Sequence, residues 1–335
     1  MILVTGGTGL LGSRLIYDLV KAGVKVRAIK RAESDLTTIQ NIFNYYSPGE
    51  KSLINNVEWV NGNIMDIYSL LEAMNGVREV YHCAASVSFN PKTLHKMMKA
   101  NIEGTANVVN ACLENSIRKL CHTSSVAAIG IIKNGKEANE DTLWRQTPKY
   151  LNYSISKFLA EREIWRGIEE GQDAVIVNPS IIIGPGNWRK SSANMFPRVW
   201  NGLPYYTSGT NGFVDVRDVS RAMIVLMKSE IKSERFIISS ENKPYKEVFE
   251  LIADNLGKKH ASIKVTPFLA EILWRLDKTR AWFTASRPAI TKEIAREASL
   301  KRQYSNIKIK KTIGLDFIPV EEAIKHTSEI FLKET

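Results

Sequence analysis

The 335-residue sequence has few cysteines, no low-complexity segment and no apolar run long enough to span a membrane. Its three cysteines, Cys83, Cys112 and Cys121, lack the paired spacing of a metal site, and two of them lie in β-like apolar runs. We therefore predict reduced core cysteines in a cytoplasmic protein, and no bound metal. Because the first residues already form an apolar β-like run, we also expect no leader peptide and no transmembrane segment.

The charge balance is basic, but the pattern does not indicate nucleic-acid binding. The sequence has 46 Lys and Arg against 35 Asp and Glu, a formal net charge of +11. These cations are dispersed, apart from a modest cluster at Lys308, Lys310 and Lys311. A phosphate-bearing small ligand or a solvated surface explains the excess equally well, so we expect no nucleic-acid partner.

The sequence does contain a regular alternation of β-like and helical segments. Helices are expected at 10–22, 94–113 and 150–168, where apolar residues recur at helical spacing. The β-like runs between them are Ile2–Val4, Lys25–Ile29, Val57–Val60, Glu79–Cys83, Leu120–Thr123 and Ala174–Val177. This alternation predicts an α/β fold with a doubly wound, mostly parallel sheet.

Four glycines lie within the first twelve residues, at the turn between the first strand and the first helix. Without Cβ atoms at Gly6, Gly9 and Gly12, a pyrophosphate can approach the free N–H groups at the positive end of the helix dipole. The spacing G-x-x-G-x-x-G is by itself a weak signal, and a purely structural turn is the alternative. We predict a dinucleotide-binding turn.

The regular alternation ends at Asn178, where a turn rich in Gly and Pro begins a loop-like stretch. We assign 1–178 and 213–238 to a dinucleotide-binding domain, and 179–212 with 239–335 to a smaller substrate domain. In the latter, an apolar helical stripe is expected to pack over the substrate pocket, with a membrane-surface contact as the alternative. It comprises Leu269, Ile272, Leu273 and Leu276, beside Trp274, Trp282 and Phe283.

A tyrosine and a lysine four residues apart share one helix face, where the ammonium lowers the pKa of the phenol. The pattern occurs three times, as Tyr17/Lys21, Tyr153/Lys157 and Tyr304/Lys308. Only Tyr153 and Lys157 begin a helix that follows a strand ending at the ligand-binding edge of the sheet. We predict that the other two pairs lie on the surface.

The strand at 120–123 brings Ser124 and Ser125 to that same edge, where a hydroxyl can hydrogen-bond a substrate carbonyl. Serine, tyrosine and lysine beside a dinucleotide turn form a proton relay for hydride transfer at a carbonyl or an alcohol. His82 and His122 lie on buried β-like runs, and we expect satisfied core residues there rather than ligands.

Seven motifs, in their order along the chain, resemble the extended short-chain dehydrogenases/reductases of the NAD-dependent epimerase/dehydratase family. They are TGGTGLLG, YHCAA, ANIEGTANVV, TSSVAAIG, YSISK, NPSIIIGPG and FVDVRDV, and they extend over essentially the whole chain. The segment SVSFNP and the NPS turn are most similar to the dihydroflavonol-reductase and 3β-hydroxysteroid-dehydrogenase-like branch. The resemblance implies a Rossmann fold and an NAD(P)-dependent dehydrogenase or reductase.

The resemblance also implies catalytic roles. Tyr153 would be the general acid/base, and Lys157 would hold the ribose hydroxyls while lowering the tyrosine pKa. Ser125 would be the active serine, because its position fits the family's S-x-x-x-x-G pattern, with Ser124 as the alternative. Asn101 matches the residue that helps to position the lysine.

A set of cofactor contacts follows from the same resemblance. Asn63 and Ile64 stand where the family usually has Asp and an apolar residue against the adenine. Ala84 and Ala85 would line the path to the nicotinamide, or simply pack under a helix. The full set is Gly6, Thr8, Gly9, Leu10, Leu11, Gly12, Lys30, Arg31, Asn63, Ile64, Ala84, Ala85, Ser124, Tyr153, Lys157 and Pro179.

Lys30 and Arg31 stand near the end of the second strand, where NAD-binding relatives commonly carry Asp or Glu. A guanidinium there can grip the 2′-phosphate of NADP with paired hydrogen bonds. We predict NADP as the cofactor, with NAD as the alternative, because Glu33 and Asp35 follow closely and could reach a ribose.

Two departures from the family narrow the substrate class. Asn178 replaces a frequent Arg, and Val126 with Ala127 replaces the Asp-Glu pair of sugar dehydratases. We predict an NADP-dependent oxidoreductase that reduces a ketone or aldehyde of a fairly apolar small molecule, or oxidises the matching alcohol. A nucleotide-sugar epimerase and a non-catalytic NADP-sensing regulator are the alternatives. Two long helices on one face of the sheet would suit a homodimer.

Overall fold

A seven-stranded sheet forms the centre of the molecule. The computed structural model describes residues 1–88, 93–132, 136–145, 151–266, 275 and 299–335. The strands of this sheet are β1 (Ile2–Thr5), β2 (Val26–Lys30), β3 (Val57–Asn61), β4 (Glu79–His82), β5 (Lys119–Thr123), β6 (Ala174–Pro179) and β10 (Glu234–Ile238). They lie in the order β10-β6-β5-β4-β1-β2-β3, and every neighbouring pair is parallel. The predicted doubly wound parallel sheet is confirmed.

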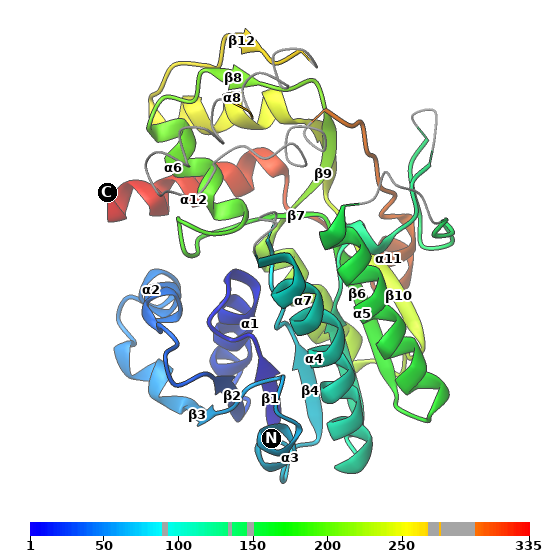
Figure 1. Cartoon of the computed structure of the whole chain (residues 1–335). Helices are drawn as coiled ribbons and strands as arrows, with labels where there is room; N and C mark the ends of the chain where they lie inside the picture. Colours follow the sequence, from blue (N-terminus) through cyan, green and yellow to red (C-terminus); the bar gives the residue numbers. More distant parts are fainter. Residues whose placement is uncertain (89–92, 133–135, 146–150, 267–274, 276–298) are drawn as a thin grey trace.

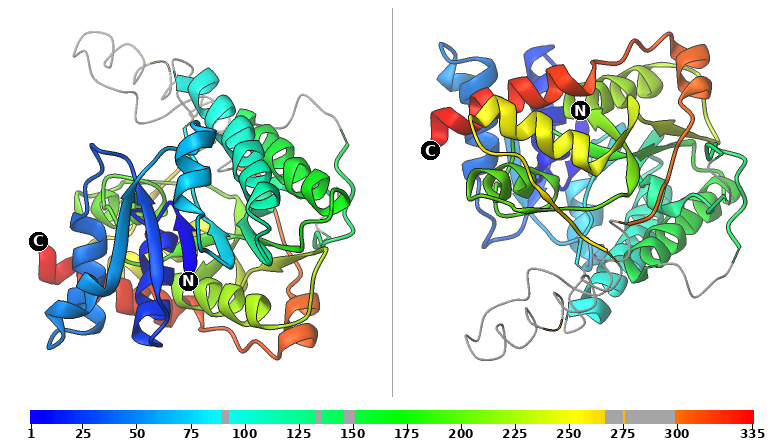
Figure 2. Two further views of the ribbon diagram at one scale, coloured as in Figure 1. Left: turned by 90° about the horizontal axis from the view of Figure 1, so that it is seen from below. Right: turned by 90° about the horizontal axis from the view of Figure 1, so that it is seen from above.

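Helices cover both faces of the sheet (Figures 1 and 2). One face carries α1 (Leu10–Lys21), α2 (Thr37–Tyr46) and α7 (Val216–Lys228), which share one apolar core. The other face carries α3 (Ile67–Ala73), α4 (Leu94–Glu114) and α5 (Asn152–Glu169), which share a second core. Strand order reverses between β1 and β4, so a crevice for a ligand is expected where the carboxyl ends of these strands diverge.

The sequence pattern explains why these segments form these elements. Leu11, Leu15 and Leu19 recur every four residues along α1, and all three are buried. All six residues of β6 are buried, as expected for a central parallel strand covered on both faces. The predicted bounds of the main-sheet strands and long helices agree with the structure to within two residues.

A second group of elements lies at the carboxyl ends of the main strands (Figure 1). Its three-stranded sheet has the order β11-β9-β7, and a two-stranded sheet pairs β12 with β8. The helices of this group pack against these strands around an apolar core that includes Phe196, Val248 and Phe331. The elements are β7 (Ile181–Ile183), α6 (Met195–Trp200), β8 (Tyr205–Tyr206), β9 (Thr210–Asp215), β11 (Glu241–Pro244), α8 (Tyr245–Leu256), β12 (Ile263–Lys264) and α12 (Val320–Glu334).

Two sequence predictions need comment here. The stretch 179–212, predicted to be loop-like, contains β7, α6 and β8, because elements of two to six residues leave no detectable period. Helix α11 (Ile307–Ile313) follows in the assigned substrate domain, yet its Ile309 joins the core around α1 and α7. The predicted domain bounds stay a prediction, and the apolar stripe at 269–283 lies outside the described residues.

Three short 3₁₀ helices complete the described elements within these residue ranges. They are η1 (Lys51–Asn56), η3 (Val126–Ala128) and η4 (Ser192–Asn194). Only η3 bears on the site, because it begins directly after Ser125 and fixes the direction in which the chain leaves β5.

Candidate functional site

The glycine-rich turn joins β1 to α1 at the carboxyl edge of the sheet. Gly6 has a φ of +72°, and a Cβ atom there would lie 2.6 Å from the backbone nitrogen of Ala84. A Cβ at Gly12 would lie 2.2 Å from the carbonyl oxygen of Gly6. Gly9, by contrast, is exposed, has a φ of −88° and would meet its nearest neighbour at 3.3 Å. The fold itself therefore requires Gly6 and Gly12, whereas Gly9 leaves the outer side of the turn open.

The first turn of α1 has the chemistry that a diphosphate needs. Gly9 caps the helix with no side-chain hydrogen bond, and the first turn contains no acidic residue. Its leading N–H groups are therefore available at the positive end of the helix dipole. Thr8 and Leu10, on either side of Gly9, are half-buried, whereas Leu11 is buried in the core. The residues present thus fit a dinucleotide.

Two glycine substitutions separate packing from ligand binding at this turn. Gly12→Ala is expected to lower the free energy of unfolding by about 1–3 kcal/mol, because its methyl group would overlap the carbonyl oxygen of Gly6. Gly9→Ala should cost less than about 1 kcal/mol, because an alanine accepts its backbone conformation. It should nevertheless weaken NADPH binding, measured by fluorescence titration. Native NADPH affinity in Gly9→Ala would place the diphosphate elsewhere.

A hollow of about 350 Å³ lies beyond the ends of β2 and β3. Arg31 is exposed at its rim and pairs with Glu33 at 3.3 Å, while Lys30 Nζ donates to Asn61 Oδ1 at 3.2 Å. Asp35 instead accepts hydrogen bonds from Thr37 at the start of α2. Those bonds are the main reason that the pKa of Asp35 is lowered. The residues lining the hollow are Arg31, Ala32, Glu33, Asn61, Gly62, Asn63, Asp66 and Ser69.

The remaining predicted cofactor contacts lie along the same edge. Asn63 is exposed, and its Oδ1 accepts a hydrogen bond from the Met65 N–H at 3.1 Å. Ile64 packs so closely on α4 that a Cβ at Gly104 would lie 2.7 Å from its Cδ1. Two of the other three positions follow β4, one half-buried and one exposed, and the third is the buried last residue of β6: Ala84, Ala85 and Pro179.

Ser125, Tyr153 and Lys157 come together where β5 ends against α5. A side-chain hydrogen bond joins Tyr153 to Ser125. Burial raises the pKa of the Tyr153 phenol, and this hydrogen bond opposes the rise. Lys157 is buried, and its Nζ donates to the carbonyl oxygen of Thr123 at 2.9 Å. Burial lowers the pKa of Lys157 to about 8, an effect that the negative charge of Glu161 opposes.

The structure separates the two candidate serines. The hydroxyl of Ser124 is buried and donates to Glu161 Oε2 at 2.6 Å, so it is engaged below the site. The hydroxyl of Ser125 is half-buried, contacts Tyr153 and accepts a hydrogen bond from the Ala127 N–H at 3.1 Å. Of the two, Ser125 thus lies beside the phenol.

Asn101 supports the site through neighbouring residues. Its side chain accepts from the Ser86 N–H at 2.7 Å and donates to the Ser86 carbonyl oxygen at 2.9 Å. It also donates to the hydroxyl of Ser156, the residue before Lys157, at 3.0 Å. Its hydrogen bonds among the described residues thus reach the neighbour of Lys157 and not the lysine itself.

Two surface predictions are wrong. Tyr17 and Tyr304 are only 6% and 5% exposed. The Tyr17 hydroxyl donates to the carbonyl oxygen of Tyr46, and Tyr304 packs against Ile237 in a small core cluster. Each tyrosine is covered by segments distant in the sequence, which the local Y-x-x-x-K pattern does not report.

The two buried histidines differ. His82 Nδ1 lies 2.7 Å from Thr5 Oγ1, and its Nε2 lies 3.0 Å from Thr105 Oγ1, so it is satisfied as predicted. The ring of His122 lies 5.1 Å away and makes no hydrogen bond among the described residues, contrary to prediction. Burial lowers the pKa of both, that of His82 to about 3, so both stay neutral near pH 7.

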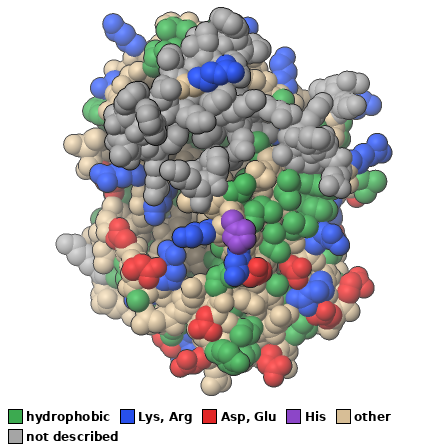
Figure 3. Space-filling model, in the orientation of Figure 1, with side chains coloured by type: hydrophobic (Ala, Val, Ile, Leu, Met, Phe, Trp, Pro, Cys, Tyr) green, Lys and Arg blue, Asp and Glu red, His purple; other side chains and the backbone are tan. Residues whose placement is uncertain are grey.

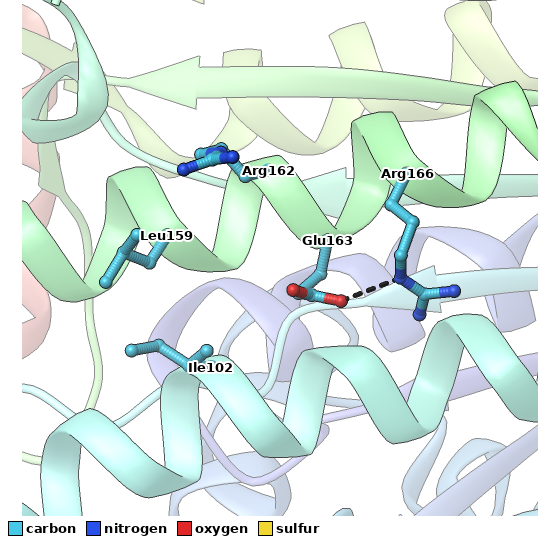
Figure 4. Close-up of a pocket in the computed structure, with 5 residues that line it drawn as sticks. All are labelled: Ile102, Leu159, Arg162, Glu163 and Arg166. Carbon is cyan, nitrogen blue, oxygen red and sulfur yellow. Dashed lines mark hydrogen bonds and ion pairs between the residues drawn. The ribbon is translucent and has the colours of Figure 1, made fainter.

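A further hollow, of about 370 Å³, lies in the groove between α4 and α5 (Figure 4). Figure 3 shows hydrophobic side chains gathered nearby over the upper part of α5. This hollow contains none of the predicted site residues, and the homodimer suggested by the two long helices stays a prediction. It is lined by Ile102, Leu159, Arg162, Glu163 and Arg166, the last two forming an ion pair.

Among the described residues, no helix is long and apolar enough to cross a membrane. Within the same part of the chain, no group of three His, Cys, Asp or Glu side chains is placed to hold a metal ion.

Comparison with known proteins identifies the family. The model of the NAD dependent epimerase/dehydratase family matches residues 2–239. The chain belongs to this family. Its members among the similar proteins include tetraketide alpha-pyrone reductase 2 of Arabidopsis thaliana, 31% identical over 75% of this chain and 81% of the relative. Sterol demethylase protein B of Methylococcus capsulatus is 28% identical over 80% of this chain and 78% of the relative.

Solved structures share the fold of this chain. The crystal structure of gox2253 has a TM-score of 0.82 and 27% identity, covering 100% of this chain and 98% of that one. UDP-glucose 4-epimerase of Thermotoga maritima has a TM-score of 0.76 at 19% identity, covering 99% of both chains, which shows the shared fold. The chain is an NAD(P)-dependent oxidoreductase enzyme of the epimerase/dehydratase family.

Sequence reasoning named Ser124 and Asn178 but missed Glu161, which binds them both, and Arg235. This buried carboxylate contacts Ser124, Asn178 and Arg235, which come from three different strands or strand ends. Its position four residues after Lys157 on α5 was a usable signal, because i, i+4 neighbours share one helix face. Nothing local in the sequence associates Arg235 with it.

Proposed function

We propose that the enzyme uses NADPH to reduce a ketone or aldehyde on a fairly apolar small molecule, or oxidises the matching alcohol. The observation that carries this proposal is the Ser125–Tyr153 hydrogen bond, with the Lys157 ammonium one helical turn further along α5. Similar proteins include anthocyanidin reductase of Arabidopsis thaliana, 27% identical over 76% of this chain and 80% of the relative. That relative's name supports reduction of a small aromatic molecule.

The side chains divide the chemistry among them. When bound, the nicotinamide supplies or accepts the hydride at the carbonyl carbon. Tyr153 donates its phenolic proton to the developing alkoxide oxygen, and recovers a proton when the reaction runs in reverse. Ser125 donates a hydrogen bond to the same oxygen and orients it. Lys157 stabilises the phenolate and would hold the ribose hydroxyls.

The alternatives receive less support. The nucleotide-sugar enzymes among the similar structures are under 25% identical to this chain, so they bear on the fold alone. In addition, β6 carries Asn178 in place of the Arg that is frequent in the family. It therefore lacks a cation that a nucleotide-sugar epimerase would use to hold the diphosphate of its substrate. A sensor without turnover has no need for a hydrogen-bonded Ser–Tyr pair beside a buried lysine.

A substrate screen tests the proposal. NADPH absorbance would be followed with aryl ketones, flavonoid-like ketones, steroids and nucleotide sugars. We expect turnover with at least one of the first three classes and none with nucleotide sugars. Activity confined to nucleotide sugars, with cofactor retained through purification, would support the epimerase instead.

The choice of NADP over NAD rests on Arg31. Its guanidinium lies at the rim of the hollow beyond β2 with only the exposed Glu33 as an ion-pair partner among the described residues. Arg31→Ala is expected to weaken NADPH binding by about 10–150-fold, the equivalent of about 1.5–3 kcal/mol for a charged hydrogen bond. NADH binding should stay almost unchanged, because NADH lacks the 2′-phosphate.

Fluorescence titration with NADPH and with NADH measures the contribution of Arg31 to the binding of each cofactor. Glu33→Gln is the matched variant: releasing Arg31 from its ion pair should leave NADPH binding equal or tighter. Equal affinity of the native protein for NADPH and NADH would contradict the NADP assignment. So would an Arg31→Ala variant that loses both cofactors alike.

A further inference from the structure

A buried carboxylate lies beneath the proposed catalytic side chains. Glu161 on α5 is 2% exposed and is surrounded by donors. Its Oε2 accepts from the Ser124 hydroxyl at 2.6 Å and from Asn178 Nδ2 at 2.8 Å. Its Oε1 accepts from Arg235 Nη1 at 3.0 Å and from Trp165 Nε1 at 3.4 Å. Four donors thus satisfy both oxygens of this buried carboxylate, one of them a charged guanidinium.

The same network holds the chain segment 123–125 to α5 at each of its three residues. The carbonyl oxygen of the first accepts from Lys157 Nζ at 2.9 Å. The hydroxyl of the second donates to Glu161 at 2.6 Å. The carbonyl oxygen of the third accepts from Asn178 Nδ2 at 3.1 Å, and the same nitrogen donates to Glu161. The backbone of Ser125 is therefore linked to α5 through Asn178 and this carboxylate, in addition to the side-chain hydrogen bond with Tyr153.

The spacing of residues along α5 places three polar side chains on one face of the helix. Tyr153, Lys157 and Glu161 stand four residues apart, so α5 presents phenol, ammonium and carboxylate along one face. Arg235 on β10, beside β6, supplies the cation that balances the buried carboxylate. Its Nε also donates to the carbonyl oxygen of Glu140 at 2.9 Å, which fixes the guanidinium in place.

We propose that Glu161 is a positioning residue, which holds Ser125 against Tyr153 and places its carboxylate on the same helix face as Lys157, with Arg235 as its ion-pair partner. This inference rests on the proposed function, because it assigns Glu161 a task in that reaction. Glu161 itself acts only through the segment 123–125 and through Lys157.

The effect of the Glu161 charge on the pKa of Lys157 can be measured, because few other groups near this lysine titrate in the same pH range. Burial lowers the pKa of the lysine to about 8, and the Glu161 charge is the largest effect opposing it. The neighbouring thiol and phenol have raised pKa values, and the two histidines have lowered ones, so all four are neutral near pH 8. These four groups are Cys83, Tyr153, His82 and His122.

NADPH binding reports the protonation of Lys157 without any substrate. The ammonium favours the anionic cofactor, so affinity should fall as the pH rises through the pKa of the lysine, between about pH 7 and about pH 9.5. In Glu161→Gln the midpoint of this fall should move down by roughly 0.5–1 pH unit, because a favourable negative charge is lost. In Arg235→Gln it should stay or move up, because the carboxylate is no longer balanced.

Opposite responses distinguish this role from a merely structural one, since a simple packing defect would shift both variants in the same direction. Midpoints that move together, or that do not move in Glu161→Gln, would overturn the proposal. The matched control is Asp173→Asn/Lys232→Gln, which removes an exposed ion pair just before the amino-terminal ends of β6 and β10. That control should titrate like the native protein.

Turnover tests the positioning of Ser125. With the aryl or flavonoid-like ketone that the native enzyme reduces fastest, Glu161→Gln should lower kcat about 10-fold or more, with the KM for NADPH at pH 7 nearly unchanged. If Glu161→Gln does not fold, Glu161→Gln/Arg235→Gln removes both charges and should show the same loss. Native kcat in either folded variant would refute the positioning role. If the native enzyme reduced no carbonyl compound, the proposed function would fail, while the binding titration would still test Glu161.

Discussion

Replacing Tyr153 with Phe is expected to lower turnover by about 10²–10⁴-fold, the usual contribution of one general acid/base group. In the proposed mechanism the phenol beside Ser125 is the proton donor, and Phe keeps its ring but has no proton to transfer. NADPH binding should stay nearly native, because the diphosphate and adenosine contacts are predicted to lie at the glycine-rich turn and at the hollow beyond β2. Steady-state kcat and a parallel NADPH titration provide both readings.

Tyr17→Phe is the matched control. Tyr17 belongs to the same Y-x-x-x-K pattern and is also covered, but its hydroxyl donates to the carbonyl oxygen of Tyr46 on the other face of the sheet. Its loss should cost about 1 kcal/mol of stability and leave kcat near native. Near-native turnover in Tyr153→Phe would show that another group exchanges the proton.

Ser125→Ala should lower kcat by about 10²–10³-fold, because removing a hydrogen bond to a developing oxyanion has an effect of that size. The hydroxyl is half-buried beside the phenol, so it can reach the same oxygen that Tyr153 protonates. Its removal also takes the acceptor from the Ala127 N–H, so unfolding should be followed in the same preparation. The expected change is mainly in kcat rather than in KM.

Ser124→Ala provides the comparison within the same turn. Its hydroxyl is one of four donors to Glu161 and does not contact the phenol among the described interactions. We expect a loss in kcat of less than about 10-fold, together with lower stability from the weakened carboxylate network. A collapse of turnover in Ser124→Ala with native kinetics in Ser125→Ala would reverse the assignment of the two serines.

The fold was largely predictable from local patterns. Continuous apolar runs of four to six residues, separated by helix-length amphipathic segments, can form a parallel sheet covered on both faces, and β6 and α1 show both patterns. Between 179 and 212 the same method failed, because β7 and β8 have only three and two residues. Such short elements exist because they pair with distant strands, and no local period encodes that pairing.

The site was predictable in part. Once the sheet order is known, parallel strands must bring Ser125 and the start of α5 to the same edge as the glycine-rich turn. Two inferences were not accessible in this way. The glycine pattern alone could not show that Gly12 serves packing while Gly9 opens the turn. The residue types alone could not show that the Asp35 carboxylate accepts hydrogen bonds from Thr37.

The sequence by itself determined the alternation of elements, the glycine-rich turn, the Ser–Tyr–Lys set and the cations after β2, because each is a pattern within a few residues. The tertiary structure alone decided which serine meets the phenol, that Tyr17 and Tyr304 are buried, and that Arg235 balances Glu161. Arg235 and Glu161 are 74 residues apart along the chain. Contacts at such separations depend on how the sheet orders its strands and on which side chains are then desolvated together, and neither quantity has a local signature.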